Sequence, residues 1–279
     1  MMEQNNFTSG YAPVNHGELY YEVAGSGQPV LLIHAGVADL KMWDGQFDLF
    51  SRSYRVIRYD TRGYGRSRTE NTEYSNRQDI LDLFSHLGVD QASIIGVSRG
   101  GQIAIDFTIE HPERVSALVP VAAGISGFEF QPDDSEEAQH ENELFIRMDD
   151  LWQKKAFDEL AELEAHVWAD GPSQPVGRAA EKIRAYVRNT VRSNFSRQDG
   201  QATPIPLFPP AYARLGEIRQ PTLVLIGEYD STGAKAAAAE LECQIPQARM
   251  VGIPHAAHMI PLEQPAKFNE LVLAFLKEG

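Results

Sequence analysis

The sequence has little cysteine and an excess of acidic over basic residues. Cys243 is the single cysteine among 279 residues, which excludes an intramolecular disulfide and a cysteine-based zinc cluster. There are 39 acidic and 25 basic side chains, giving a formal net charge of −14. A non-specific nucleic-acid binder needs excess Lys and Arg to neutralise phosphates. The composition therefore excludes that class of protein.

The sequence also lacks a segment suited to a membrane. Its longest apolar run, residues 115–125, is interrupted by Pro120 and Gly124 and is too short to span a bilayer. The polar residues 1–10 do not contain the apolar core of a signal peptide. We therefore expect a cytoplasmic protein with no membrane partner, either a monomer or a homodimer.

Short apolar runs alternate with stretches of helical periodicity. The expected strands are residues 18–23, 29–34, 54–59, 92–97, 115–122, 222–227 and 249–253, and the expected helices include 77–87, 100–110 and 265–277. Strands that alternate with helices indicate parallel β–α–β units. The predicted fold class is therefore α/β, with a mostly parallel central sheet covered by helices on both faces.

The pattern changes between residues 124 and 219. This stretch has no convincing strand, and residues 145–167 and 177–195 have helical periodicity. We expect a helical cap (124–219) inserted into a core domain (1–123 and 220–279). Residues 124–170 hold 14 acids and 3 bases, whereas 171–219 hold 3 acids and 8 bases. Two explanations are open: ion pairs within the cap, or an acidic entrance that disfavours anionic substrates.

A candidate nucleophile follows the expected strand 92–97. Gly96-Val97-Ser98-Arg99-Gly100 has the Gly-x-Ser-x-Gly pattern and precedes a helix. In this setting the serine occupies a strained strand-to-helix turn that exposes its hydroxyl above the sheet edge. A free helix N-terminus at the same place favours developing negative charge.

A serine needs a base to remove its proton, and the base needs an acid to orient it. Asp230 follows the strand 222–227, and His258 follows the strand 249–253. The order Ser98, Asp230, His258 is that of an α/β-hydrolase triad. Glu228 is the rival acid, although it lies closer to the end of the strand. His255 and His258 have no third ligand at metal-binding spacing, so no metal is predicted.

With these residues the sequence resembles the α/β-hydrolase superfamily over nearly the whole chain outside the insert. Residues 60–67, Asp-Thr-Arg-Gly-Tyr-Gly-Arg-Ser, resemble the family's Asp-x-Arg-Gly-x-Gly-x-Ser turn, which implies a structural role for Asp60 and Arg62. His34-Ala35-Gly36-Val37 resembles the His-Gly oxyanion loop, with Ala35 in place of the usual glycine.

The resemblance further implies an oxyanion hole made of backbone N–H groups. Its donors would be Gly36, with Val37 as the alternative, and Arg99, the residue after the nucleophile. For the Arg99 side chain two roles are open: an ion pair, or a contact with an anionic substrate.

The combination predicts a serine hydrolase of small esters or lactones that needs no cofactor, similar to the carboxylesterase and enol-lactonase branch. Two alternatives stay open: a capped receptor with slow turnover, and a carbon–carbon bond hydrolase. The apolar candidates for the substrate pocket are Val37, Trp43, Phe128, Trp152 and Trp168. Each of them could instead serve only in packing.

Overall fold

The computed structural model describes residues 7–197 and 202–278, so residues 1–6 of the polar N-terminal segment lie outside the described residues. Its strands are β1 (Phe7–Val14), β2 (Gly17–Ala24), β3 (Pro29–Ile33), β4 (Arg55–Tyr59), β5 (Arg68–Thr69), β6 (Glu73–Tyr74), β7 (Ala92–Val97), β8 (Val115–Val121), β9 (Thr203–Pro204), β10 (Thr222–Gly227) and β11 (Ala248–Ile253). Its α-helices are α1 (Asp44–Phe50), α2 (Asn76–Leu87), α3 (Arg99–Glu110), α4 (Glu136–Gln153), α5 (Phe157–Ala165), α6 (Glu181–Phe195), α7 (Thr232–Gln244), α8 (Ile260–Glu263) and α9 (Pro265–Leu276).

A single mixed sheet forms the centre of the molecule. Its strand order is β1-β2-β4-β3-β7-β8-β10-β11, with β5 paired to β2. The strands from β4 to β11 along this order run parallel, whereas β2 is antiparallel to both β1 and β4. The predicted α/β class and mostly parallel sheet are therefore confirmed.

The buried strands have apolar side chains on both faces. Leu31 and Ile33 of β3 belong to one core cluster with residues of α2, α3 and α7. Val30 and Leu32 belong to a second cluster with residues of α1 and α9. A strand covered on both faces reads as a continuous apolar run, and this is why β3, β7 and β10 were recognisable from the sequence.

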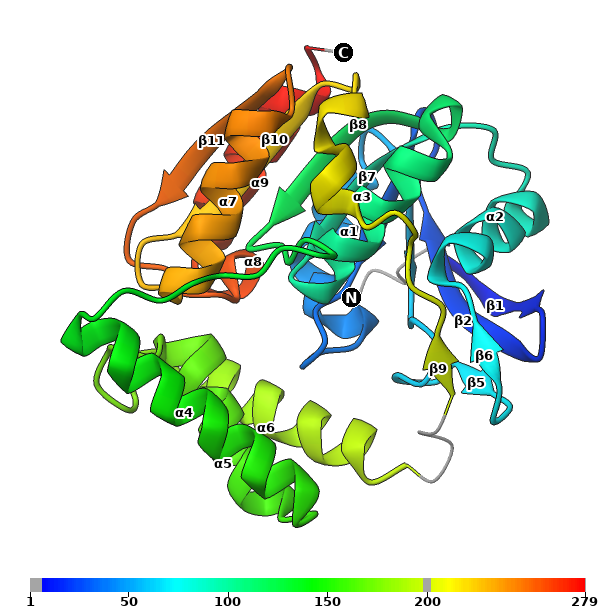
Figure 1. Ribbon diagram of the computed structural model, residues 1–279. Coiled ribbons are helices and arrows are strands. Elements are labelled where there is room, and N and C mark those ends of the chain that lie inside the picture. The colour runs from blue at the N-terminus through cyan, green and yellow to red at the C-terminus, as the bar shows by residue number, and fades with distance from the viewer. Residues whose placement is uncertain (1–6, 198–201, 279) are drawn as a thin grey trace, which may run out of the picture.

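The segment between β8 and β10 contains the helices α4, α5 and α6. Figure 1 shows α4, α5 and α6 gathered on one side of the molecule, the side toward which the arrows of β8 and β11 point. Further along, Leu207, Ala211 and Leu215 return to the core cluster that contains α3. The domain division at residues 124 and 219 stays a prediction.

This segment departs from the expected pattern in two places. The stretch 145–167 is not one helix, because α4 starts at Glu136 and ends at Gln153, and Lys155 has a φ of 55° before α5 begins. The short strand β9 pairs in parallel with β6, where no strand was expected. Among the described residues, no helix is long and apolar enough to cross a membrane.

Candidate active site

The Gly-x-Ser-x-Gly pattern forms a sharp turn between β7 and α3. Ser98 occupies this turn with φ 55° and ψ −117°, a conformation that L-residues rarely adopt. A Cβ at Gly100 would lie 2.6 Å from the carbonyl oxygen of His34 and closer still to that of Ile33. Only glycine lets the start of α3 approach β3 this closely, so the sequence pattern follows from the geometry of the turn.

The candidate acid and base come together because β10 and β11 are parallel neighbours. Asp230 follows β10 and His258 follows the end of β11, and both side chains are buried. The Nδ1 atom of His258 lies 3.0 Å and 2.9 Å from the carboxylate oxygens of Asp230. A carboxylate only accepts hydrogen bonds, so this contact places the proton on Nδ1 and leaves Nε2 as a proton acceptor.

The rival acid lies elsewhere. Glu228 is exposed, and its carboxylate accepts a hydrogen bond from the backbone N–H of His255 at 2.8 Å. The His255 ring is also exposed, and its Nδ1 lies 3.0 Å from the hydroxyl of Tyr229. Both residues therefore brace the loop after β11.

A cavity of about 220 Å³, here called the reaction chamber, brings the serine and the histidine together. Its lining residues are Gly36, Val37, Tyr64, Ser98, Glu164, Trp168, Phe195 and His258. Ser98 follows the end of β7 and His258 lies in the loop after β11, whereas Glu164 belongs to α5 and Phe195 to α6. The insert therefore forms one wall of the chamber.

The loop after β3 borders the same chamber and is held by a buried histidine. His34 Nδ1 lies 2.7 Å from the carbonyl oxygen of Ala35, and its Nε2 accepts the backbone N–H of Thr61 at 3.0 Å. Burial lowers the pKa of His34 to about 4, so the ring is neutral and donates through Nδ1. Its two hydrogen bonds fix the loop that carries Gly36.

Candidate backbone donors lie in this loop and in the turn: Gly36 and Val37 line the chamber, and Arg99 directly follows Ser98. A Cβ built on Gly36 would lie 3.7 Å from the side chain of Arg99. Within the described part of the chain, the N–H groups of Gly36, Val37 and Arg99 have no hydrogen-bond acceptor. Such free donors beside a serine hydroxyl are the groups that an oxyanion hole requires.

The Asp-x-Arg-Gly turn serves to brace the loops around the chamber. The Asp60 carboxylate accepts the backbone N–H groups of Leu40 at 2.8 Å and Arg66 at 2.7 Å. The buried Arg62 forms a two-point ion pair with Asp79, whose shorter contact is 2.6 Å.

The five predicted pocket residues divide into three groups. Val37 and Trp168 line the reaction chamber, and the Trp168 ring lies 4.5 Å from that of His258. Trp152 lines a neighbouring cavity instead. Trp43 is fully buried in the core, with its ring 6.0 Å from that of Phe268. Phe128 packs on Tyr212 at a ring distance of 5.1 Å.

Trp43 and Phe128 are therefore corrections to the pocket prediction. Each is an aromatic residue close in sequence to a functional loop, and an aromatic residue packs equally well in a core or beside a ligand. Sequence spacing alone does not separate these two roles.

Sequence reasoning missed Glu164, a buried carboxyl in the chamber wall. The carboxylate of Glu164 accepts a hydrogen bond from the indole N–H of Trp168. Burial raises its pKa to about 7, although the hydrogen bond from Trp168 opposes this rise. The one available signal was the spacing of Glu164 and Trp168, which places both on one face of a helix.

A family model described as the alpha/beta hydrolase fold matches residues 28–265. The chain is 25% identical to "2-hydroxy-6-oxo-6-phenylhexa-2,4-dienoate hydrolase" of Comamonas testosteroni, covering 97% of both chains. It is 28% identical to "3-oxoadipate enol-lactonase 1" of Acinetobacter baylyi, covering 86% of this chain and 85% of the relative.

Solved structures show the same architecture. The structure of the enol-lactonase from Burkholderia xenovorans LB400 superposes with a TM-score of 0.76 at 24% sequence identity, over 96% of this chain and all of that one (100%). At this level of identity the likeness concerns the fold.

Proposed function

Because the chain belongs to the alpha/beta hydrolase fold family, we propose that it is a serine hydrolase that cleaves small carboxylic esters or lactones. The hydrogen-bonded pair of Asp230 and His258 carries this proposal, together with the position of Ser98 in the same chamber as His258. These are the three groups that a hydroxyl nucleophile needs for activation.

In the proposed mechanism, His258 Nε2 accepts the hydroxyl proton while Ser98 Oγ attacks the carbonyl carbon. The Asp230 carboxylate stabilises the imidazolium that forms. The N–H groups of Gly36 and Arg99 donate to the tetrahedral oxyanion, and each donor lowers the barrier by roughly 3 kcal/mol. The intermediate collapses to an acyl-enzyme as His258 gives its proton to the leaving alkoxide.

Water then completes the reaction. His258 removes a proton from the water molecule as its oxygen attacks the acyl carbon, and the carboxylic acid leaves as the proton returns to Ser98. All proton transfers in this sequence use the chain's own side chains. The chamber of about 220 Å³ favours a small acyl group rather than a polymer.

A second candidate reaction is hydrolysis of a carbon–carbon bond. It is favoured by the relative from Comamonas testosteroni, which is named as a hydrolase of a 2-hydroxy-6-oxo-dienoate. The enol-lactonase relative favours the ester or lactone reaction. The same triad can serve both, so substrate assays must separate them.

The test is hydrolysis of p-nitrophenyl butyrate with Ser98→Ala as the inactive variant. We expect many turnovers in the wild type and a fall in kcat of at least about a thousand-fold in the variant. Ser116→Ala is the matched control, because Ser116 is an exposed serine on β8 that pairs with Ser93. We expect it to retain full activity, and intact mass should show one butyryl group on the wild type after rapid quenching.

Three results would contradict the proposal. A single turnover followed by a stall would favour the receptor alternative. A higher kcat/KM for the 2-hydroxy-6-oxo-dienoate than for any ester or lactone would favour the carbon–carbon hydrolase. Activity that survives in Ser98→Ala would remove Ser98 as the nucleophile.

A further inference from the structure

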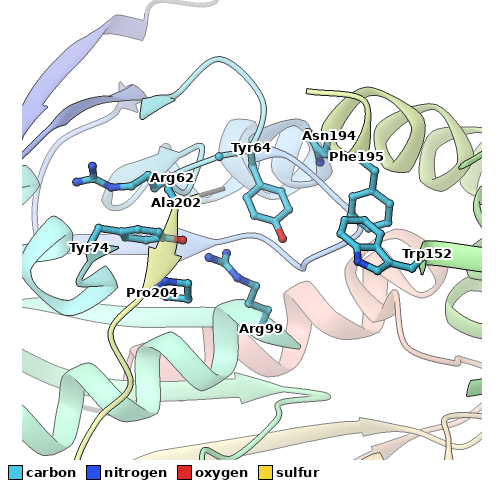
Figure 2. A pocket seen from close by; sticks show the side chains of 10 residues that line it. Arg62, Tyr64, Tyr74, Arg99, Trp152, Asn194, Phe195, Ala202 and Pro204 are labelled. Carbon is cyan, nitrogen blue, oxygen red and sulfur yellow. The ribbon is translucent and has the colours of Figure 1, made fainter. Parts of the chain in front are cut away.

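A second cavity of about 230 Å³ adjoins the reaction chamber, and Tyr64 and Phe195 line both. It is here called the arginine pocket. Arg62, Tyr74 and Arg99 are among its other lining residues. Figure 2 shows the guanidinium group of Arg99 and the hydroxyls of Tyr64 and Tyr74 directed toward the same space.

Among residues 7–197 and 202–278, the charge of Arg99 is not balanced by a salt bridge to an acid. One Nη atom donates to the Thr61 hydroxyl at 2.8 Å and the other to the Asn76 amide oxygen at 3.4 Å. The guanidinium carbon lies 4.7 Å from the centre of the Tyr64 ring. These partners are all neutral, and no carboxylate lies within 4.0 Å of Arg99 among residues 7–197 and 202–278.

Two acids near Arg99 have other partners. Asp79 is paired with Arg62 at 2.6 Å, and Asp106, which lines a further cavity together with Arg99, accepts the Ser126 hydroxyl at 2.7 Å. A half-buried guanidinium without a counter-ion carries a desolvation cost that a bound anion would offset. The ion pair that the sequence suggested for Arg99 is therefore missing from the described residues.

The geometry suits a planar anion. The guanidinium group has more N–H donors than its two neutral partners use, and its planar shape matches the two oxygens of a carboxylate. The hydroxyls of Tyr64 and Tyr74 can donate to the same group. Because the arginine pocket and the reaction chamber share Tyr64 and Phe195, one substrate molecule can place its anion here and its carbonyl carbon at Ser98 Oγ.

We propose that the arginine pocket is a carboxylate subsite, and that the substrates are small esters or lactones carrying one carboxylate group. This inference rests on the proposed function and names its substrate class. The net charge of −14 acts against anions at long range, but salt screens it beyond about 8 Å. The local contact with Arg99 is not removed by that screening.

The first test compares esters that differ only in charge. The mono-p-nitrophenyl esters of succinic, glutaric and adipic acid are compared with their methyl diesters, and 4-carboxyphenyl butyrate with its methyl ester, all at one ionic strength. We expect kcat/KM to favour the charged member of at least one pair. Arg99→Gln should reduce that preference roughly 10- to 100-fold, and Arg99→Lys should restore part of it.

Arg66→Gln is the matched control for the loss of one positive charge. The Arg66 side chain is exposed by 49%, lies 3.8 Å from Glu22 and does not line the arginine pocket. We expect this variant to keep the wild-type preference. Thermal melting of each variant shows whether it is folded. The ratio of kcat/KM for the charged ester to kcat/KM for the uncharged ester cancels any change in activity that affects both substrates equally.

The second test measures binding without turnover. In the Ser98→Ala background, calorimetry should show that monomethyl glutarate binds more tightly than dimethyl glutarate, and Arg99→Gln should abolish the difference. Equal binding of the two compounds, or no binding at millimolar concentration, would overturn the subsite. If the two glutarate esters bind equally or not at all, but Ser98 is still needed for hydrolysis of p-nitrophenyl butyrate, the proposed function stands and only the subsite is refuted.

Discussion

Two carboxylates follow β10, and their surroundings assign them different roles. Asp230 is buried and contacts His258 through both oxygens, whereas Glu228 is exposed and holds the backbone of His255. The Oδ1 atom of Asp230 also accepts the N–H of Ser231 at 2.8 Å, which fixes the rotamer. This arrangement gives a direct test of which acid orients the base.

Asp230→Asn should lower kcat for ester hydrolysis by about a thousand- to ten-thousand-fold. The amide that replaces the carboxylate can present its NH₂ group to Nδ1, which places the histidine proton on the wrong nitrogen. Steady-state kinetics with p-nitrophenyl butyrate measure the effect. Glu228→Gln is the isosteric control and should change kcat less than about three-fold; a loss equal to that of Asp230→Asn would contradict the assignment.

At the scale of elements, the turn between β7 and α3 depends on close contacts between backbone segments. Gly100 meets the carbonyl oxygens at the end of β3, and Gly96 meets the backbone of Gly100 itself. The loop after β3 is also tied to α6, because the Tyr186 hydroxyl lies 2.8 Å from the Asp39 carboxylate and Asn194 donates to the Ala38 carbonyl at 3.2 Å. The loop after β3 is thus held between the sheet and the insert.

Gly100→Ala should destabilise the protein by roughly 1–3 kcal/mol, because the new methyl group has to displace β3 or α3. Urea unfolding followed by circular dichroism measures the change. Gly45→Ala in α1 is the matched control, since a Cβ there has no neighbour within 4 Å. It should be neutral or slightly stabilising, because alanine favours a helix more than glycine does. Equal stability of the two variants would show that the turn tolerates a side chain.

The oppositely charged halves of the insert contact each other in the structure. Its acidic first half and basic second half meet between α5 and α6, where Arg192 lies 2.8 Å from Asp158 and Arg188 lies 3.4 Å from Glu162. The buried Asp170 is paired with Arg184. These contacts support the explanation that the charge division forms ion pairs within the insert.

At the scale of the whole molecule, several carboxyl groups are buried, and their hydrogen bonds do not fully offset the desolvation of the charged form. Burial raises the pKa of Glu164 to about 7, and those of Asp60 and Asp106 to about 6. A carboxyl whose pKa is raised in the folded protein stabilises the fold below its unfolded pKa. That contribution is lost as the pH rises through the folded pKa.

The free energy of unfolding should therefore fall between pH 5.5 and pH 8. Growing repulsion within a chain of net charge −14 acts in the same direction. Glu164→Gln should reduce this fall by about 2 kcal/mol, because glutamine has no charge to bury and still accepts the Trp168 N–H. Urea unfolding at both pH values measures it. If the variant and the wild type lose equal stability, Glu164 does not titrate in this range.

The sequence by itself determined the fold class, and it also predicted Ser98, Asp230 and His258 as the triad. Strands buried on both faces are continuous apolar runs, and the glycines around Ser98 are required by backbone contacts that no other residue permits. The positions of Asp230 and His258 follow from strand order, because parallel strands bring the loops at their carboxyl ends to one edge of the sheet. These features are local in sequence or fixed by topology.

Only the tertiary structure decided what faces the chamber. Trp43 and Trp168 are both tryptophans near predicted functional loops, but Trp43 fills the core and Trp168 packs at a tilt against the His258 ring. Glu164 enters the site from α5, because packing of the insert brings together segments far apart in the sequence. Arg99 contacts Thr61, Asn76 and Tyr64, and it has no acidic partner among the described residues. Which side chains meet across such a contact depends on helix orientation, and periodicity does not encode that orientation.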